Sequence, residues 1–507
     1  MSSPDAPPRH PWRALLADAP MLGMTLAIVA LLTRTFLARV GHPYDLEWME
    51  GGMLLHALRV MEGQALYVQP TADFIPFIYP PLYHWVLAGL GQLFGLDHTL
   101  GRAMSMASTL LGTGALVAAV VGETGRRGWA AALGAAGLFL ACYDDGGAFF
   151  DLVRIDGMLL ALLGWSLVAI RHGWLRAGGL LLVLAYLTKH NAAICGLPAL
   201  IWLWRTQGRG PALRFVAWSV APALVATGLI QLEGDRLFLT YLLGVPALHG
   251  YVPRRLFFGA PKELWAALEW AHLLTLAAFP PLLGGSLGMK GTAGHRFWVG
   301  QGVTLLLLAC VMRGHTGGYL NVLIPGFWIL SLWAGLALFA LRERLDDGSY
   351  RGFFVRLSTA VLVAAVLWEG RWSPERFSPD VADREAGDRI VERIRAVPGP
   401  VLAPWSPWLP VAAGKAPGFH LIGLWDIDHD GGPLQPAIAD IEADIAAQRW
   451  TVVMTSNDKL GLGLSSAYSK AERVQPAGGA LRPKSGWKVR PKDFWRPRAP
   501  AEAGDAP

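Results

Sequence analysis

The chain has 507 residues, of which 53% are hydrophobic and 16% are charged, and its mean hydropathy is +0.36. Soluble domains carry about 25% charged residues, so this composition excludes an ordinary soluble protein and indicates a polytopic membrane protein. The net charge of +6 does not indicate a nucleic-acid partner, because Lys and Arg gather in short loops between apolar runs. The three cysteines, Cys142, Cys195 and Cys310, lie in apolar stretches, and their spacing indicates neither a disulfide framework nor a zinc motif.

Apolar runs predict a transmembrane domain over residues 15–370. The first run, 15–32, follows a polar start and lacks a small-residue cleavage site, so we expect an uncleaved span with residues 1–14 as a cytoplasmic tail. Ten more runs approach the length that crosses a hydrocarbon core of ~30 Å. They are 101–122, 128–143, 156–171, 175–190, 192–205, 213–232, 263–285, 296–312, 318–341 and 353–369, which gives about eleven spans.

Loop charge predicts the orientation of these spans. Basic residues fall on every second connection, and the positive-inside rule assigns those connections to the cytoplasm. The large first outer loop 38–100, the loop 143–155 and everything after about 372 then lie on the far side of the membrane. Residues 79–96 are apolar enough to cross, but counting them would reverse this pattern, so we predict a half-embedded interfacial helix there. A twelfth span is the alternative.

The C-terminal part has a different composition. Residues 389–397 and 438–449 are predicted to form helices, and 401–403 and 451–455 short strands, which indicates a small α/β domain over 371–485. Residues 486–507 are rich in Pro, Arg, Lys and Ala, and we expect them to be disordered.

The first outer loop carries three carboxylates directly after a span, at Asp45, Glu47 and Glu50. Acids at a membrane boundary cost free energy unless they stay hydrated, pair or take part in chemistry. A carboxylate in a shielded cleft is a good general base for an acceptor hydroxyl or amine. A solvated acidic loop is the alternative interpretation of the same residues.

Further polar clusters are predicted on the same side. Arg154 and Asp156 lie where a span begins, at a depth where charges pair with each other or contact a ligand. Lys189 and His190 interrupt a helical hairpin, where a lysine either binds a phosphate or extends toward lipid headgroups. Glycine-rich turns that suit anions surround a further set of polar residues, Arg313, His315 and Asn321.

Because these clusters meet at one face of the membrane, the sequence predicts a site that opens outward and combines acids with cations. The chain contains no P-loop and no Gly-rich turn after a strand. A phosphate compound bound here is therefore expected to be carried by a lipid.

Five motifs in this order resemble the C-type (GT-C) integral-membrane glycosyltransferases over residues 20–345, with bacterial relatives of protein O-mannosyltransferases and of the lipid A aminoarabinose transferase as the most similar branch. They are Asp45-Leu46-Glu47, Tyr79-Pro80-Pro81-Leu82-Tyr83, Arg154-Ile155-Asp156, Leu187-Thr188-Lys189 and Gly317-Gly318-Tyr319-Leu320-Asn321. The resemblance implies a GT-C fold and transfer of a sugar from a polyprenyl-phosphate donor to a lipid, glycan or protein acceptor on the periplasmic side of a bacterial inner membrane.

The resemblance also implies roles for individual residues. The base falls on Asp45 or Glu47, and the sequence does not decide between them. The family's second-loop Arg and Asp fall on Arg154 and Asp156, and its donor-phosphate lysine falls on Lys189. From the polar clusters themselves we expect Arg154 and Arg313 to contact the donor phosphate as well, and we expect substrate contacts at Glu50, Tyr79, Asp156, His190, His315 and Asn321. No metal or other cofactor is expected, although Asp45, Glu47 and Asp144 or Asp145 offer oxygen ligands for a divalent cation. The alternatives to an enzyme are a polytopic transporter and a non-catalytic subunit of a cell-envelope polysaccharide assembly system.

Overall fold

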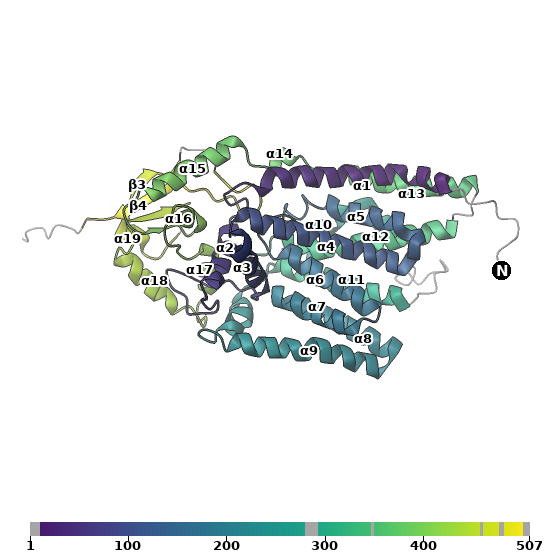
Figure 1. Ribbon diagram of the computed structural model, residues 1–507, viewed down its shortest axis with the longest axis horizontal. Helices are drawn as coiled ribbons and strands as arrows, with labels where there is room; N and C mark the ends of the chain where they lie inside the picture. The colour runs from purple at the N-terminus through teal and green to yellow at the C-terminus, as the bar shows by residue number, and fades with distance from the viewer. Residues whose placement is uncertain (1–10, 279–292, 346–348, 457–459, 476–480, 500–507) are drawn as a thin grey trace, which may run out of the picture.

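The computed structural model describes residues 11–278, 293–345, 349–456, 460–475 and 481–499. It consists of an elongated helical bundle with a small α/β domain at one end, and the first described helix, α1, begins at the opposite end (Figure 1). We call the end of the bundle next to the α/β domain the domain end. The expected cytoplasmic tail lies mostly outside the described residues, and so do the last residues of the predicted span 263–285.

Each of the eleven predicted spans corresponds to a helix of the bundle. These helices are α1 (Pro11–Val40), α4 (His98–Thr124), α5 (Trp129–Ala141), α6 (Asp156–Arg171), α7 (Leu175–Thr188), α8 (Gly196–Gln207), α9 (Arg209–Gln231), α10 (Ala260–Ala278), α11 (Ala293–Gly314), α12 (Ile324–Leu345) and α13 (Tyr350–Glu369). Within the described ranges, six helical segments are long and apolar enough to cross a membrane, one of them containing both α4 and α5. The prediction of a polytopic helical membrane protein is therefore confirmed.

Burial separates central helices from lipid-facing ones. In the span that contains α12, 83% of the most apolar 18-residue stretch is buried inside the protein. In α9 the corresponding share is 17%. An apolar helix whose surface is mostly exposed in the folded chain is suited to contact lipid tails. The helix α12 is therefore the centre of the bundle, and α9 lies at its lipid-facing edge.

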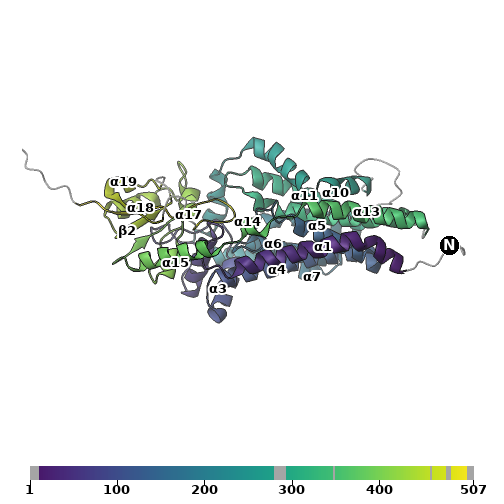
Figure 2. The same cartoon turned by 90° about the horizontal axis from the view of Figure 1, so that it is seen from above.

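The first outer loop folds into a cap at the domain end of the bundle. Its helices α2 (Glu50–Met61) and α3 (Leu82–Phe94) pack against each other next to the α/β domain, and α3 runs across the direction of the bundle helices (Figures 1 and 2). At ~1.5 Å per residue, the 13 residues of α3 span roughly 20 Å, which is shorter than the ~30 Å hydrocarbon core. This arrangement agrees with an interfacial helix rather than a twelfth span.

Short helices connect the bundle to the cap and the domain. At the ends of bundle helices lie η1 (Gly125–Gly128), η2 (His190–Cys195) and η7 (Leu320–Leu323), and between α9 and α10 lie η3 (Thr240–Gly244), η4 (Pro246–Leu248) and η5 (Arg255–Gly259). The helix α14 (Pro374–Phe377) leads from α13 into the α/β domain.

The C-terminal domain is built on a four-stranded sheet with the order β1-β2-β4-β3. The strands are β1 (Val401–Leu402), β2 (Val452–Thr455), β3 (Tyr468–Arg473) and β4 (Asp493–Pro497), and only β1 and β2 run parallel. The helices are α15 (Val381–Arg395), α16 (Trp408–Ala412), α17 (Leu421–Ile427), α18 (Ala437–Ala446) and α19 (Leu464–Ala467).

The expectation of disorder over 486–507 is wrong for the part that the structure describes. Strand β4 lies between β2 and β3, where Val453 pairs with Trp495 and Lys470 pairs with the same residue from the other side. The sheet therefore extends beyond the predicted domain boundary at 485. Residues 500–507 lie outside the described residues.

Candidate functional site

The first outer loop is organised around a buried ion pair between Glu50 and Arg102. Both side chains are fully buried, and the closest nitrogen and oxygen atoms are 2.6 Å apart. The Arg102 guanidinium also donates hydrogen bonds to three backbone carbonyls of the loop start, those of Arg39, His42 and Tyr44. Glu50 in turn accepts from the backbone N–H groups of Leu46, Glu47 and Val153. This network fixes the backbone that presents the acidic residues.

Glu50 and Asp45 each contact a basic side chain of the loop network. Burial opposes ionisation of Glu50, but the Arg102 guanidinium outweighs it and holds the pKa of Glu50 at about 2. Asp45 lies 2.8 Å from the ring nitrogen Nε2 of His98. Burial raises the pKa of Asp45, and contact with His98 opposes that rise. Neither carboxylate lies among the residues that line the cavity described below.

Asp45, Glu50 and His98 form a group whose ligand atoms all lie within 4.8 Å of one another. A divalent cation needs several oxygen or nitrogen atoms that are free to coordinate it. Here the Glu50 carboxylate already accepts hydrogen bonds from Arg102 and from backbone N–H groups, and Asp45 contacts His98. Contacts with Arg102, with backbone N–H groups and between Asp45 and His98 thus hold these three side chains together.

A cavity of about 320 Å³ lies at the domain end, between the bundle, the cap and the α/β domain. Ligand sites in proteins are typically clefts of about this size or larger. Six of the eleven predicted site residues line it, namely Glu47, Tyr79, Arg154, Lys189, His315 and Asn321. The structure therefore brings residues from four separate parts of the sequence to one place.

Glu47 is the acid of the first outer loop that lines the cavity, although its side chain is only 3% exposed. Its Oε2 atom lies 3.5 Å from Nη1 of Arg154 and accepts a hydrogen bond from the backbone N–H of Met49. Within the described residues, Oε1 has no hydrogen-bond partner. Burial raises the pKa of Glu47 to about 7, although the positive charge of Arg154 opposes the rise. A carboxylate with a pKa near 7 is well matched to general-base catalysis at neutral pH.

Two cations line the same cavity. The Nη2 atom of Arg154 donates to the hydroxyl of Tyr79 at 3.2 Å. The ammonium of Lys189 lies 3.5 Å from Asp156, whose other oxygen accepts a hydrogen bond from the side-chain amide of Asn321 at 2.9 Å. Asp156 thus lies behind the lining and holds both Lys189 and Asn321 in place.

Close helix packing positions these groups at the start of α6. A Cβ atom on Gly157 would lie 2.8 Å from the backbone oxygen of Ser105 and 2.9 Å from the hydroxyl of Thr109, both on α4. Small residues let membrane helices approach closely. The start of α6, with Arg154 and Asp156 beside it, therefore lies directly against α4, which carries Arg102.

The other five predicted site residues do not line this cavity. Asp45 and Glu50 belong to the loop network, and Asp156 lies behind the lining. His190 lines a separate groove described below. Arg313 makes a two-pronged ion pair with Glu263, with both N–O distances 2.8 Å, so its charge is already matched within the bundle. The cavity geometry therefore gives no support to the predicted phosphate contact of Arg313.

Several lining residues were not predicted as site residues. Trp48, Trp425, Asp426 and Trp487 all line the cavity, the last three from the C-terminal domain. Burial raises the pKa of Asp426 to about 8, and its Oδ1 atom lies 3.7 Å from Nε2 of His249. Of these four residues, only Trp48 could have been found from local sequence, because it directly follows the predicted site residue Glu47. The other three are brought in by long-range packing that no local pattern reveals.

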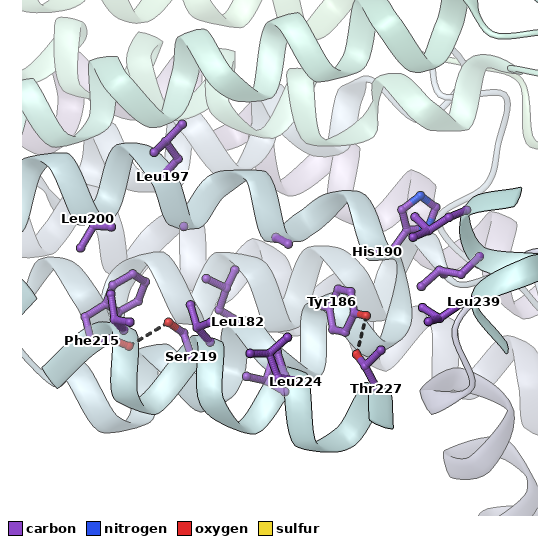
Figure 3. Close-up of a pocket in the computed structure, with 18 residues that line it drawn as sticks. Leu182, Tyr186, His190, Leu197, Leu200, Phe215, Ser219, Leu224, Thr227 and Leu239 are labelled. Atoms are coloured by element: carbon purple, nitrogen blue, oxygen red, sulfur yellow. Dashed lines mark hydrogen bonds between the residues drawn. The ribbon is translucent and has the colours of Figure 1, made fainter. Parts of the chain in front are cut away.

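An apolar groove of about 540 Å³ lies between α7, α8 and α9 (Figure 3). Leucine, valine and alanine side chains make up most of its lining, and its few hydroxyl groups are satisfied internally, as in the 2.7 Å bond between Tyr186 and Thr227. His190 lies at one end of the groove (Figure 3), and its chain neighbour Lys189 lines the polar cavity. Two consecutive residues of the chain thus line the two spaces, His190 the groove and Lys189 the cavity.

Comparisons with known proteins show what this chain resembles. Residues 77–236 match the model of glycosyltransferase family 87. No curated protein matches the chain by sequence. Two solved structures of ArnT from Cupriavidus metallidurans are similar over 93% of this chain and 98% of theirs. The apo structure has a TM-score of 0.60 at 16% identity, and the structure bound to undecaprenyl phosphate has 0.57 at 14%. At this identity the likeness shows a shared fold.

The oligosaccharyltransferase AglB from Archaeoglobus fulgidus, in complex with an inhibitory peptide and a dolichol-phosphate, is also similar. It matches with a TM-score of 0.44 at 12% identity over 86% of this chain and 69% of its own length.

Proposed function

We propose that this chain, a membrane glycosyltransferase with the GT-C fold, transfers a sugar from a polyprenyl-phosphate donor to an acceptor hydroxyl or amine in the cavity at its domain end. One observation carries the proposal. A single cavity combines an acid of raised pKa, Glu47, with the cations Arg154 and Lys189, and the chain neighbour of Lys189, His190, lines an apolar groove. A lipid phosphate needs both the cations and the groove, and sugar transfer needs the base.

The reaction can be assigned to residues of this chain. The acceptor oxygen or nitrogen attacks the anomeric carbon of the sugar, and the bond from that carbon to the phosphate oxygen breaks. The electron pair of this bond leaves with the lipid phosphate, whose growing negative charge is stabilised by Lys189 and Arg154. Glu47 accepts the proton of the attacking group. A single displacement of this kind inverts the configuration at the anomeric carbon.

Between the two acids that the sequence left open, we assign the base to Glu47. It lines the cavity with Oε1 unpartnered among the described residues, whereas Asp45 lies outside the lining and contacts His98. Asp45 then acts as a positioning residue. With Glu50 and Arg102 it holds the loop that presents Glu47.

The apolar groove is the proposed place of the polyprenyl chain. Its lining offers an apolar chain almost no unsatisfied polar group, and His190 at one end of it is the chain neighbour of Lys189. A chain bound there would carry its phosphate toward the cations of the cavity. The undecaprenyl phosphate bound by the similar ArnT structure supports a donor of this chemistry.

We also propose the bacterial inner membrane as the location, with the domain end on the periplasmic side. The helices α4, α6 and α8 run away from the domain end, so the basic loops that follow them lie at the N-terminal end (Figure 1). Under the positive-inside rule that end faces the cytoplasm.

A transporter is less well supported than an enzyme. Secondary transporters place their polar residues near the middle of the membrane, at interrupted helices in matching halves. Here the cations and acids lie at one end of the bundle, next to a folded domain. A non-catalytic subunit would not need a base and cations in one cavity.

The experiment is transfer of label from a panel of radiolabelled polyprenyl-phosphate sugars into lipid, glycan and protein acceptors by the full chain in lipid nanodiscs. Transfer of one sugar supports the proposal, and the absence of both transfer and donor binding across the panel contradicts it. Donors with long and short prenyl chains test the groove. Ala223→Trp fills the groove from α9, whereas Ala221→Trp, on the exposed side of the same helix, is the matched control.

We expect A223W to raise KM for the long-chain donor while leaving the short-chain donor unaffected, and A221W to change neither. If both donors respond equally to A223W, the chain does not lie in this groove.

A further inference from the structure

Three tryptophans from separate parts of the chain meet at the wall of the cavity. Trp48 comes from the first outer loop, Trp425 from α17, and Trp487 from the segment before β4. The ring centroids of Trp48 and Trp487 are 5.0 Å apart, those of Trp425 and Trp487 are 5.2 Å apart, and those of Trp48 and Trp425 are 5.8 Å apart. We call these three residues the tryptophan cluster.

The structure holds the cluster in place through His420. Its Nε2 atom donates a hydrogen bond to the backbone oxygen of Trp48 at 2.9 Å, and its Nδ1 atom accepts from the backbone N–H of Ile422 at the start of α17. A Cβ atom on Gly423 would lie 2.9 Å from the side chain of Ile75, so α17 packs tightly on the first outer loop. The positions of Trp48 and Trp425 are thus fixed before any ligand binds.

Exposure shows that the cluster is more than interior packing. Trp48 is 6% exposed, whereas Trp487 is 45% exposed and Trp425 is half-buried. All three line the cavity rather than only the outer surface of the domain. The face of an indole ring carries negative potential and attracts the polarised C–H groups on the apolar face of a sugar ring. A partly exposed indole side chain at a cavity wall is therefore suited to contact with a sugar.

Polar groups beside the cluster can bind sugar hydroxyls. Asp426 follows Trp425 in the chain, lines the same cavity, and has a side chain that is 14% exposed. His249, next to it, also lines the cavity. Sites for polar small molecules combine apolar and aromatic walls with a few converging polar groups.

The cluster also lies next to the proposed base. Trp48 follows Glu47 directly, and a Cβ atom on Gly486, which precedes Trp487, would be 2.8 Å from Cγ of Glu47. Lys189 lines the cavity from the bundle instead, with Asp156 behind it. A sugar stacked on the cluster would thus lie on the side of Glu47 that faces the C-terminal domain, away from the phosphate contacts.

We propose that the tryptophan cluster, with Asp426, forms the acceptor subsite and that its ligand is a carbohydrate, either a free glycan or the sugar headgroup of a glycolipid. This inference rests on the proposed sugar transfer, because it names the acceptor of that reaction. The stacked ring presents one hydroxyl to Glu47, and the ring faces of Trp425 and Trp487 select pyranoses over peptides.

The test measures binding to the full chain in lipid nanodiscs by intrinsic tryptophan fluorescence and saturation-transfer NMR. The probes are a panel of trisaccharides (mannose, glucose, galactose, xylose and N-acetylglucosamine types), the matching short-chain alkyl glycosides, and a panel of Ser- and Thr-containing peptides. Undecaprenyl phosphate is measured separately. The variants are Trp487→Ala, Trp487→Phe and the control Trp174→Ala, a tryptophan 64% exposed at the start of α7.

We expect at least one sugar to bind, W487A to weaken it by about two- to tenfold, and W487F to retain most of the affinity. W174A should change nothing, and undecaprenyl phosphate should bind equally to all variants. Tighter binding of the alkyl glycoside than of the trisaccharide identifies a glycolipid headgroup, and the reverse identifies a free glycan.

Sugar binding that is insensitive to W487A, or a panel in which only peptides bind, overturns the proposal and leaves the proposed function standing. Failure of the wild-type protein to bind undecaprenyl phosphate contradicts the proposed function instead, and sugar binding weakened by W487A would still support the subsite.

Discussion

The Glu50–Arg102 pair gives the sharpest prediction about how the site is built. Replacing Glu50 by Gln removes the negative charge but keeps the shape of the side chain. Arg102 then loses its carboxylate partner. The amide NH2 of the new side chain also cannot accept a hydrogen bond, so the N–H of either Leu46 or Val153 loses its acceptor. Breaking one partner of a buried ion pair costs about 3–5 kcal/mol. We expect E50Q to lose stability in that range.

The matched control is Glu385→Gln on α15. Glu385 pairs with Arg389 at 3.7 Å, but both side chains are more than half exposed, at 61% and 67%. Exposed ion pairs contribute about 0–1 kcal/mol, so E385Q should change stability little.

The free energy of unfolding of both variants is measured by reversible unfolding in mixed micelles with a denaturing detergent. Sugar transfer is measured in parallel. E50Q should also reduce transfer, because the backbone N–H of Glu47 is bonded to Glu50. The double variant E50Q/R102Q should lose less stability than the sum of the single losses, since no unpaired charge remains. Equal stability of E50Q and E385Q would refute the proposed role of the pair.

The remaining predictions concern the cavity. Gly486→Ala should lower kcat, because the new Cβ atom would lie 2.8 Å from Cγ of Glu47. Gly461→Ala is the control: its φ of +72° is similar to the +64° of Gly486, but a Cβ atom there would have no neighbour within 4 Å, so kcat should not change. Lys189→Met should raise KM for the lipid-phosphate donor, measured as the rate over a range of donor concentrations, and an unchanged KM would exclude the phosphate contact. Treatment with EDTA should leave the rate of transfer unchanged, because the Asp45 and Glu50 carboxylates already contact His98 and Arg102; a loss restored by added divalent cation would contradict this.

The parts of the fold that follow from local sequence were predictable. A span is a continuous apolar run, so each of the eleven runs corresponds to a helix, and α3 was distinguished from a span by the charge pattern of the loops that follow it. Strand β4 was not predicted, since its pairing with β2 and β3 is long-range and its Pro- and Arg-rich surroundings resemble a disordered tail.

The candidate site was predictable in part for the same reason. Glu47, Arg154 and Lys189 lie beside the ends of spans, where a charge is conspicuous against its apolar neighbours. The sequence gives no sign that Arg313 is matched by Glu263, because the two residues lie on different helices. Trp425 and Trp487 reach the cavity only because the C-terminal domain packs against the first outer loop, and local sequence does not reveal this packing.

The most direct test of the central claim is the pH dependence of kcat for the wild-type protein and for Glu47→Gln and Asp45→Asn. Because the pKa of Glu47 is raised to about 7, the base is ionised above that pH, so the wild-type rate should fall about tenfold per unit below it. E47Q should lower kcat by about 10²–10⁴-fold and abolish this pH dependence, whereas D45N should keep it. If D45N abolishes transfer and E47Q retains the wild-type rate and profile, Glu47 is not the base.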